Sequence, residues 1–475
     1  MLHLIIYGLT STPLLVYVLA VWAVMLPRAF FAYVYYALYH NARNPLRYRK
    51  SAWLFTTFCH RDAAKSVALQ TTRYYAPVHG AAYGVSVIVT VTAYADAEAF
   101  ERALVLMRES LEAADVPHEI LVVIDAVPQK RMLYFGTTDA ARAMRRIREI
   151  AQRYANYVAA HNNGNKRVGL VHALRRARHP IAAMMDDDTI CERTTVPAAL
   201  AYFANPRIGG VTTAQRVYKP ETVMQRIADW LENARLMASM PAMALFGQVG
   251  CLPGRLYFVR RALLLSHLEA FTHDYAWYPR RVLRKPGDDR WITMCIMRQG
   301  YWTVLAPAAR VQTLAPATVR ETIPQQRRWA VSSQWYTLES LSWLWRFPMT
   351  AFVYLSDIIV ITLGTVAMTL YWAYVSLTGD MDQSLSAALA IALAGMSLTV
   401  AIRQLPHLSR NWRDIPLIPL FALWAFFMQI DARLRGLVWP VWGRWQTRAG
   451  VDGTDAGRKE FWVIKDERIG ARPGD

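Results

Sequence analysis

Cysteine and charge are both scarce in this 475-residue sequence. The four cysteines, Cys59, Cys191, Cys251 and Cys295, include no Cys-x-x-Cys pair, so neither a zinc knuckle nor a disulfide framework is predicted. Charged residues make up only 19% of the chain, yet the net charge is +19. Zinc-finger spacings and a basic zipper are also lacking, which argues against nucleic acid as a partner. The basic surplus instead favours lipid headgroups or a phosphorylated substrate.

Apolar residues, in contrast, make up 54% of the chain, and the mean hydropathy is +0.12. The sequence is apolar from Leu4 to Leu26 and largely so to Tyr39, long enough to cross about 30 Å of hydrocarbon. A basic cluster follows in a stop-transfer, positive-inside pattern: Arg43, Arg47, Arg49 and Lys50. We expect an uncleaved transmembrane anchor over residues 1–40, a basic interfacial linker over 41–83, and a cytosolic segment after them.

The chain turns apolar again after residue 346. Candidate membrane spans cover residues 348–374, 385–402 and 415–432. The last of these is short and interrupted by Pro416 and Pro419, so we expect it to be re-entrant or interfacial. A C-terminal transmembrane or re-entrant region is therefore predicted over 347–448, and a polar, largely flexible tail over 449–475.

Between the apolar regions, residues 84–322 alternate between β-branched runs and amphipathic stretches. Strands are predicted at 86–92, 120–124 and 181–185, and helices at 97–115, 139–158 and 168–178. This β-α-β-α-β order predicts an α/β domain with a parallel, doubly wound sheet. Ligands of such sheets bind beyond the carboxyl ends of the strands, which makes polar residues at those ends candidates for a site.

Two groups of acidic residues follow predicted strands. Asp125 closes the second strand and could accept the imide N–H of a uracil ring, although a turn or helix-cap aspartate explains it equally well. The run Asp186, Asp187 and Asp188 follows the third strand. Because alternate residues of an extended chain point the same way, Asp186 and Asp188 are expected to share a face. Converging carboxylates suit a divalent cation on a diphosphate, and the alternative is a solvated acidic loop.

A third acidic motif is Gly287-Asp288-Asp289-Arg290, which follows a basic stretch. A carboxylate here could be the general base that deprotonates an acceptor hydroxyl, and the alternative is a surface Asp–Arg pair.

Two further motifs combine basic and aromatic residues. Lys166 and Arg167 follow an Asn-rich loop and precede a helix, so they could cradle phosphate oxygens; ordinary solvated cations are the alternative. The sequence Gln325-Gln326-Arg327-Arg328-Trp329 opens an aromatic segment, predicted as an interfacial helix over 323–346. In a functional interpretation, Arg328 contacts a diphosphate and Trp329 stacks on a sugar ring.

In this order along the chain, the motifs resemble those of family 2 glycosyltransferases, specifically of the processive branch that contains hyaluronan, chitin and cellulose synthases. The resemblance covers roughly residues 85–330 and depends on the ordered set of motifs. It implies a GT-A-type fold, in which a doubly wound, mostly parallel sheet is inserted between transmembrane and interfacial helices. It also implies UDP-sugar donors and Mg²⁺ or Mn²⁺ as the cofactor.

The resemblance assigns roles to residues at matching positions. The residues implied to bind the donor nucleotide are Thr92, Ala93, Tyr94, Asp125 and Lys166. The cation is implied to bind Asp188 and Asp186. The catalytic motif is implied to supply Asp289 as the base, flanked by Asp288 and Arg290. Residues implied to contact the acceptor or close the site are Cys251, Gly254, Gln325, Arg328, Trp329, Trp442 and Arg448.

Two details of the resemblance lean toward hyaluronan synthases. These enzymes carry Gly-Asp-Asp-Arg, and their C-terminal Trp-Gly-Thr-Arg motif resembles Trp442-Gly443 and Thr447-Arg448 with an insertion between them. The expected protein is therefore an integral membrane enzyme, presumed by this resemblance to act at the plasma membrane. It would contact membrane lipids and polymerise UDP-GlcNAc and UDP-GlcA on the cytosolic side. The growing polysaccharide would be exported through a channel formed by its own membrane spans.

Three alternatives stay open at this point. One is a chitin- or cellulose-like homopolymer synthase, and another is a non-processive transferase that adds one sugar to a lipid. From a different class, the chain could be a transporter or a catalytically silent scaffold. A transporter more often carries its charged residues within the spans, whereas the key carboxylates here lie outside them.

Overall fold

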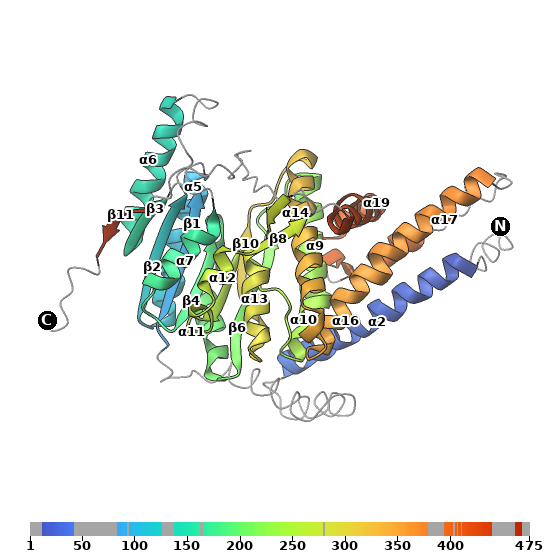
Figure 1. Cartoon of the computed structure of the whole chain (residues 1–475), viewed down its shortest axis with the longest axis horizontal. Coiled ribbons are helices and arrows are strands. Elements are labelled where there is room, and N and C mark those ends of the chain that lie inside the picture. Colours follow the sequence, from blue (N-terminus) through green and yellow to red (C-terminus); the bar gives the residue numbers. More distant parts are fainter. Residues whose placement is uncertain are drawn as a thin grey trace. The chain divides into compact units, whose positions relative to one another are not determined.

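Figure 1 shows the computed structural model, which describes residues 12–41, 83–92, 95–125, 137–161, 165–278, 281–378, 394–401, 404–405, 407–409, 411–438 and 461–467. The expectations for Ala93, Tyr94, Trp442, Arg448 and most of the 41–83 linker lie outside these residues. The chain divides into two compact units. The helical unit comprises Met1–Ala37, Glu221–Phe246 and Ala317–Trp442, and the sheet unit comprises Leu38–Pro220, Gly247–Pro316 and Gly443–Asp475.

The sheet unit is built on a nine-stranded sheet with the order β11-β3-β2-β1-β4-β7-β6-β10-β5. Strands β3, β2, β1 and β4 are parallel neighbours, β6 and β10 are parallel to each other, and β7 runs antiparallel to both β4 and β6. The predicted α/β fold with a mostly parallel sheet is therefore confirmed. The strands are β1 (Val85–Thr92), β2 (His118–Asp125), β3 (Tyr157–His161), β4 (Ile181–Asp186), β5 (Ile190–Cys191), β6 (Ile208–Val217), β7 (Leu256–Arg260), β10 (Trp302–Thr313), β11 (Phe461–Asp466) and, in a separate hairpin, β8 (Tyr275–Tyr278) and β9 (Arg281–Arg284).

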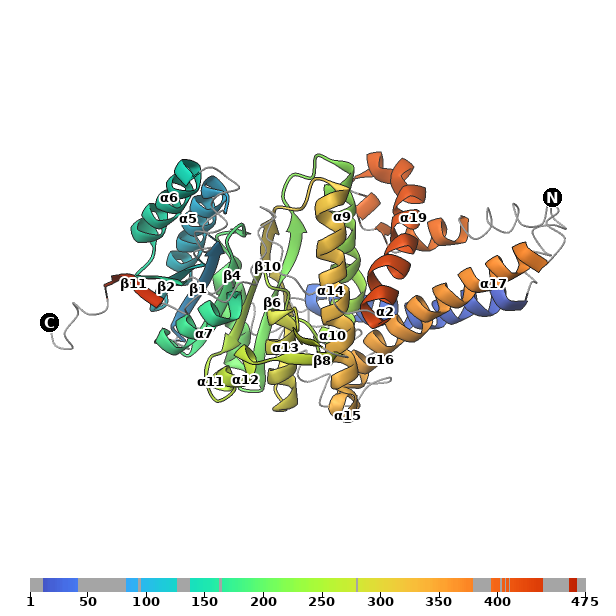
Figure 2. The same cartoon turned by 45° about the horizontal axis from the view of Figure 1, so that its top comes forward.

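Helices cover both faces of this sheet (Figure 2). The predicted apolar stripe of α5 is buried on one face, together with apolar residues of α6 and α8. On the other face α7 approaches closely because Gly169 has no side chain: a Cβ there would lie 2.9 Å from His161 Nε2 and 3.1 Å from Val123. The helices of the unit are α5 (Ala97–Ala114), α6 (Thr137–Tyr154), α7 (Lys166–Arg176), α8 (Thr195–Leu200), η2 (Ala201–Ala204), α11 (Ala262–Leu265), α12 (Leu268–Thr272) and α13 (Asp288–Arg298).

The sequence analysis predicted only β1, β2 and β4 of this sheet; the other six strands, among them β3 and β11, were not predicted. The helix predicted over 139–158 ends at Tyr154, and strand β3 occupies residues assigned to that helix. The short apolar run of β3 is compatible with either structure, and only its pairing with β2 decides between them. Strand β11 lies within the predicted polar tail and pairs antiparallel with β3. It is held there by Lys465, whose Nζ donates to the carbonyls of Gln152 and Ala155.

Among the residues that the structure describes, the helical unit has three helical segments long and apolar enough to cross a membrane: Val16–Tyr39, Pro348–Tyr371 and Trp412–Val438. The last segment is longer than the 415–432 stretch identified in the sequence, and its two prolines do not interrupt it. That it is re-entrant or interfacial stays a prediction. Pro416 lies in the 3₁₀ turn that opens the segment, and Pro419 in the first turn of α19, where a missing N–H breaks no helical hydrogen bond. Of the predicted 385–402 span, the structure describes a helix over 394–401.

The elements of the helical unit follow one another with π-helical turns inside the apolar segments. They are α2 (Thr12–Asn41), α9 (Val223–Ala234), η3 (Arg235–Ser239), α10 (Met240–Leu245), α14 (Val319–Glu339), α15 (Leu341–Leu344), α16 (Pro348–Ser356), η4 (Asp357–Leu363), α17 (Gly364–Thr378), η5 (Trp412–Leu417), α19 (Ile418–Met428), η6 (Gln429–Leu434) and α20 (Arg435–Val438).

The apolar segments of this unit bury polar groups and expose apolar ones. Arg28, in the middle of the first segment, is 2% exposed and donates to Asp357 Oδ1 at 2.7 Å and to the Val353 carbonyl at 2.9 Å. Large apolar residues are exposed on the same segments: Val16, Leu19, Leu26, Ile359, Leu370, Leu420 and Leu423. Charges turned inward and apolar side chains turned outward are the arrangement that a bilayer favours.

Candidate active site

The carboxyl ends of the parallel strands bring the first candidate residues to one edge of the sheet. The register pairs Thr92 with Asp125, Asp125 with His161, and Thr90 with Asp186. Asp125 and Asp186 are thus two strand spacings apart across the sheet and offset by two residues along it, about 12 Å in all. Residues that are 61 positions apart in the sequence therefore share the sheet edge at which ligands of such folds bind.

Asp186 ends β4 and forms an ion pair with Lys166. Lys166 begins α7, and its Nζ donates to Asp186 Oδ1 at 2.5 Å. Burial by itself would lower the pKa of Lys166, but the charges of Asp186 and of the carboxylates next to it raise that pKa above its ordinary value. Lys166 is therefore cationic at neutral pH and offsets part of the negative charge gathered at this sheet edge.

Asp188 is held by the end of another strand. Its Oδ2 accepts hydrogen bonds from the Thr313 hydroxyl at 2.9 Å and from the Leu314 N–H at 3.2 Å, and the residue is 7% exposed. The chain was expected to stay extended through Asp188, and this is wrong: a turn follows Asp186, in which the Thr189 N–H donates to the Asp186 carbonyl. The turn carries Asp188 toward the end of β10.

The chemistry of these two carboxylates fits a divalent cation. Within the residues that the structure describes, no three His, Cys, Asp or Glu side chains are grouped so as to hold a metal by themselves. Mg²⁺, however, is commonly bound by one or two carboxylates together with substrate phosphates. Asp186 and Asp188 supply hard oxygen donors of the type that Mg²⁺ and Mn²⁺ prefer, so the donor set suits a cation that arrives with a diphosphate.

Asp289 faces the same region from the first turn of α13. The helix begins after Gly287, whose φ of 96° is accessible mainly to glycine, and the helix N-terminus favours the negative charge of Asp289. Asp289 Oδ2 accepts the Gly254 N–H at 3.1 Å. A Cβ placed on Gly254 would lie 3.7 Å from Asp186 Oδ2 and 3.8 Å from Asp289 Oδ2. Both carboxylates therefore border one small space, which the absence of a side chain at Gly254 leaves open.

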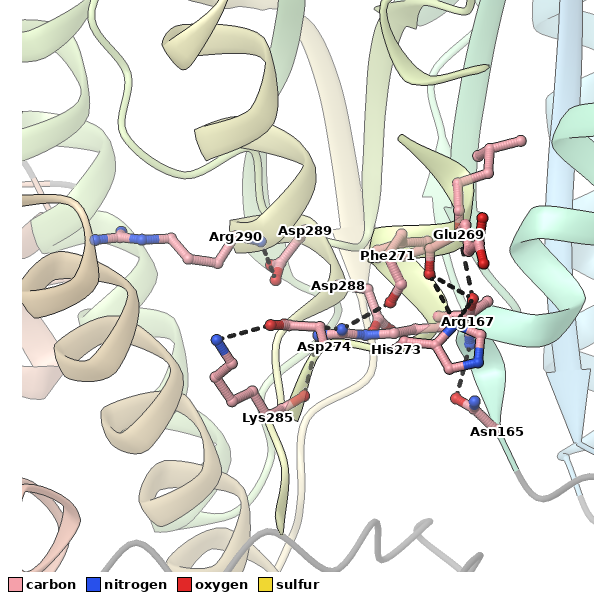
Figure 3. Close-up of polar contacts among 12 residues, drawn as sticks. Asn165, Arg167, Glu269, Phe271, His273, Asp274, Lys285, Asp288, Asp289 and Arg290 are labelled. Atoms are coloured by element: carbon pink, nitrogen blue, oxygen red, sulfur yellow. Dashed lines mark hydrogen bonds and ion pairs between the residues drawn. The ribbon is translucent and has the colours of Figure 1, made fainter. Parts of the chain in front are cut away.

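Asp288 and Asp289 have different hydrogen-bond partners, and that of Asp288 is an arginine. Asp288 Oδ1 accepts a hydrogen bond from Arg167 Nε at 2.7 Å (Figure 3). Arg167 is 1% exposed and also binds Asp274. The alternative of solvated cations is therefore wrong for Arg167, and a role in cradling phosphate does not suit it either, because its donors are used within the protein.

Arg290, Cys251 and Tyr257 lie in the same unit as Asp289. Arg290 is buried, and its side chain extends to the opposite side from Arg167 (Figure 3). Cys251 Sγ lies 3.8 Å from Asp289 Oδ2. Tyr257, in β7, is 2% exposed; burial and the nearby carboxylates, Asp289 first, raise its pKa well above the ordinary value, so its hydroxyl stays protonated.

Asp125 lies next to a neutral histidine. His161 Nδ1 is 3.5 Å from Asp125 Oδ1, a distance at which a charged histidine would form an ion pair. Burial and repulsion from His172 lower the pKa of His161 to about 4, so at neutral pH the two side chains form no ion pair. Thr92, on the neighbouring strand, is half-buried at the same edge.

Gln325, Arg328 and Trp329 lie in the helical unit, on α14. This helix starts at the Thr318 cap, whose side chain accepts the Glu321 N–H, and Trp329 is 36% exposed on it. The preceding arginine of the motif, Arg327, forms a bidentate ion pair with Asp431 of η6 at 2.8 and 2.6 Å.

One residue near the site, Asp274, was missed by the sequence analysis. Asp274 and Lys285 form an ion pair at 2.7 Å, and Asp274 also accepts from Arg167 at 3.0 Å. Arg167 and Asp274 are more than one hundred positions apart, and neither stands in a local pattern that points to the other. The basic stretch before Gly287, which includes Lys285, was identified in the sequence, but its ion-pair partner Asp274 could be found only from the structure.

The mixed, mostly parallel sheet, with a lysine and aspartates gathered at its carboxyl edge, is a GT-A fold. Residues 85–332 match the family described as glycosyltransferase like family 2, and the chain belongs to this family.

Named relatives agree with this assignment. The chain is 25% identical over 380 residues to a type 2 glycosyltransferase of Pyricularia oryzae, covering 74% of this chain and 73% of the relative. It is 27% identical over 182 residues to an N-acetylglucosaminyltransferase of Azorhizobium caulinodans, covering 37% of this chain and 44% of the relative. The structure of the mannosyltransferase PcManGT from Pyrobaculum calidifontis, in complex with GDP-Man and Mn²⁺, has a TM-score of 0.50 at 19% identity, over 86% of this chain and 99% of that chain. The last likeness shows a shared fold.

Proposed function

We propose that this chain transfers sugars from UDP-sugars to a growing polysaccharide, with inversion at the anomeric carbon. The observation that carries the proposal is the space beside Gly254, bordered by Asp186 Oδ2 and Asp289 Oδ2 at 3.7 and 3.8 Å from the Cβ position. A donor diphosphate on the Asp186 side and an acceptor hydroxyl on the Asp289 side would meet there. Such an arrangement holds the two reactants in attack geometry.

In the proposed step, Asp289 accepts the proton of the acceptor hydroxyl as that oxygen attacks the anomeric carbon. A new C–O bond forms on the face opposite to the diphosphate, and the bond to the diphosphate oxygen breaks with its electron pair staying on UDP. A base of this kind contributes about 10²–10⁴-fold. The Gly254 N–H and the first turn of α13 would keep the carboxylate oriented for this proton transfer.

Asp186 and Asp188 would hold Mg²⁺ or Mn²⁺ together with oxygens of the diphosphate. The cation would offset the negative charge that builds on the departing UDP. Lys166 would orient Asp186, and Thr313 would orient Asp188, so that both carboxylates are positioned before the donor arrives. The Mn²⁺ that accompanies GDP-Man in the PcManGT structure supports this assignment.

The nucleotide would bind at the carboxyl ends of β1 and β2. Thr92, Ala93 and Tyr94 would line the uridine pocket, and Asp125 would accept the imide N–H of uracil. The position of Asp125 at the carboxyl end of β2, opposite Thr92, supports this contact. We also propose that Gln325, Arg328 and Trp329 of α14 take part in the reaction, with Arg328 binding the diphosphate and Trp329 stacking on a sugar ring.

We further propose that the enzyme is embedded in the membrane, with its catalytic domain in the cytosol, and that it is processive and exports its product. The three apolar segments and their inward-facing polar groups support membrane embedding. The N-terminal basic cluster that follows the first segment supports the cytosolic side. Export would be tested with sealed inverted vesicles: polymer found only outside them would contradict it.

The proposed donors are UDP-GlcNAc and, for hyaluronan, UDP-GlcA. The name of the Azorhizobium relative supports the first, and Gly-Asp-Asp-Arg at 287–290 supports the second. The experiment is UDP release by the purified protein with UDP-sugars singly and in pairs. Turnover that needs both donors supports hyaluronan, polymer from UDP-GlcNAc alone indicates a chitin-like homopolymer, and a short product indicates a non-processive transferase. No UDP release with any UDP-sugar would overturn the proposed function.

A further inference from the structure

One buried guanidinium ties together several segments around the predicted base. Arg167 Nε donates to Asp288 Oδ1 at 2.7 Å, and its Nη1 donates to Asp274 Oδ2 and to the Phe271 carbonyl, both at 3.0 Å. Nη2 donates to the Lys285 carbonyl at 3.0 Å, and the guanidinium carbon lies 4.9 Å from the centre of the Phe271 ring. Figure 3 shows these contacts converging on Arg167.

The partners of Arg167 mark the ends of the elements around Asp289. Phe271 belongs to α12, Asp274 directly precedes β8, Lys285 directly follows β9, and Asp288 begins α13. Arg167 therefore fixes both ends of the β8–β9 hairpin and the start of the helix that carries Asp289. A second cation reinforces the hairpin base, since Lys285 Nζ pairs with Asp274 Oδ1 at 2.7 Å.

The residue before Arg167 contacts the other side of the site. Lys166 forms an ion pair with Asp186. Lys166 and Arg167 are consecutive residues in the first turn of α7. The N-terminus of α7 thus connects the carboxylate proposed for the donor with the helix of the proposed base. Because these contacts are made by consecutive residues of one helix turn, a displacement of α7 would move both.

We propose that Arg167 is a positioning residue that sets the place of Asp289 through Asp288 and the β8–β9 hairpin. This inference rests on the proposed function. It predicts an effect on turnover and not on donor affinity, because Arg167 has its donors committed to protein atoms and Asp289 is assigned to the acceptor. Lysine cannot replace it: its donors share one nitrogen, whereas the planar guanidinium reaches partners along different directions.

The test compares Arg167→Lys with Arg175→Lys in the full-length protein. Arg175 is exposed on the same helix and serves as the matched control. For Arg167→Lys we expect kcat to fall about 10–100-fold, as for a misplacement of about 1 Å, with the Kd for UDP unchanged. Arg175→Lys should match the wild type in both. An unchanged kcat in Arg167→Lys would overturn the proposal, and so would a parallel loss of UDP affinity, which would make Arg167 a donor-binding residue.

A second measurement separates this inference from the proposed function. Amide hydrogen exchange over residues 281–298 should be faster in Arg167→Lys than in Arg175→Lys, whether or not any UDP-sugar is turned over. Should the Lys variant fail to fold, Asp274→Asn removes one charged partner and leaves the Asp288 contact, with a smaller loss of kcat expected in the same direction. Unchanged exchange and unchanged kcat in that variant would refute the positioning role. Absence of wild-type turnover combined with faster exchange would refute the enzyme function alone.

Discussion

Gly254→Ala offers the sharpest test of the space between Asp186 and Asp289. The added methyl would lie 3.7 Å from Asp186 Oδ2, 3.8 Å from Asp289 Oδ2 and 4.0 Å from Asp289 Cβ. These are ordinary van der Waals distances, and Gly254 is not among the residues with positive φ, so the protein accommodates the methyl without a clash or backbone strain.

The same substitution stabilises a compatible site by about 0.4–1 kcal/mol, because alanine restricts the unfolded chain. We therefore expect an unchanged or slightly raised thermal unfolding midpoint. Activity should respond in the opposite direction, since the methyl occupies the space in which donor and acceptor would meet. Shifting the reactants by about 1 Å predicts a loss in kcat/KM of about 10²-fold.

The assay is UDP release under initial-rate conditions, together with thermal unfolding of the same preparations. Gly395→Ala is the control, because the structure places nothing within 4 Å of its Cβ position. Wild-type kcat/KM in Gly254→Ala would refute the view that the reactants meet beside Gly254. A lowered unfolding midpoint would instead show that the loss of activity came from misfolding.

Four further predictions follow from the site and its support. Asp289→Asn should keep UDP binding and lower kcat about 10²–10⁴-fold; near-wild-type UDP release would remove Asp289 from the role of base. Chelation of divalent cations should abolish UDP release and added Mn²⁺ or Mg²⁺ should restore it, so full activity in chelator would contradict the metal assignment. His161 has a lowered pKa in the folded state, so the stability it contributes is present above pH 6.5 and is lost as the pH falls toward about 4. His161→Gln should therefore remove an acid destabilisation of about 2 kcal/mol between pH 7.5 and 5, measured as the shift in unfolding midpoint, and an equal shift in both proteins would contradict this. Asp431→Asn should lower the free energy of unfolding by about 1–3 kcal/mol by breaking the bidentate pair with Arg327, and the Arg327→Asp/Asp431→Arg double variant should recover part of it; an unchanged midpoint in Asp431→Asn would count against a stabilising pair.

Local patterns in the sequence predicted the parallel strands β1, β2 and β4 and the helices α5, α6 and α7 of the sheet unit. The β-branched run of β1 and the apolar stripe of α5 appear in the structure within one or two residues of the predicted bounds. Both patterns depend on which face is buried, and that information is local. Strands β5, β6, β7 and β10 had no predicted counterpart. Strand β3 was missed because its apolar run is also compatible with a helix, and β11 was missed because it is defined by pairing with β3, which is distant in the sequence.

The candidate site divides in the same way. The acidic motifs identified Asp125, Asp186 and Asp289 as candidates because each stands at the end of a strand or the start of a helix. The contacts of these residues were not predictable: Lys166 was linked to phosphate rather than to Asp186, and Arg167 was grouped with Lys166 although it binds Asp274 and Asp288.

The sequence by itself determined the class of fold, the apolar segments and the residue types at the sheet edge, because hydrophobic period and strand ends are properties of neighbouring residues. Only the tertiary structure decided that Asp186 and Asp289 border one space beside Gly254, and that one buried arginine holds the hairpin next to it. The physical reason is distance along the chain. A hydrogen bond acts over about 3 Å in space, and which distant atoms come within that range is fixed only when the strands pair and the helices pack.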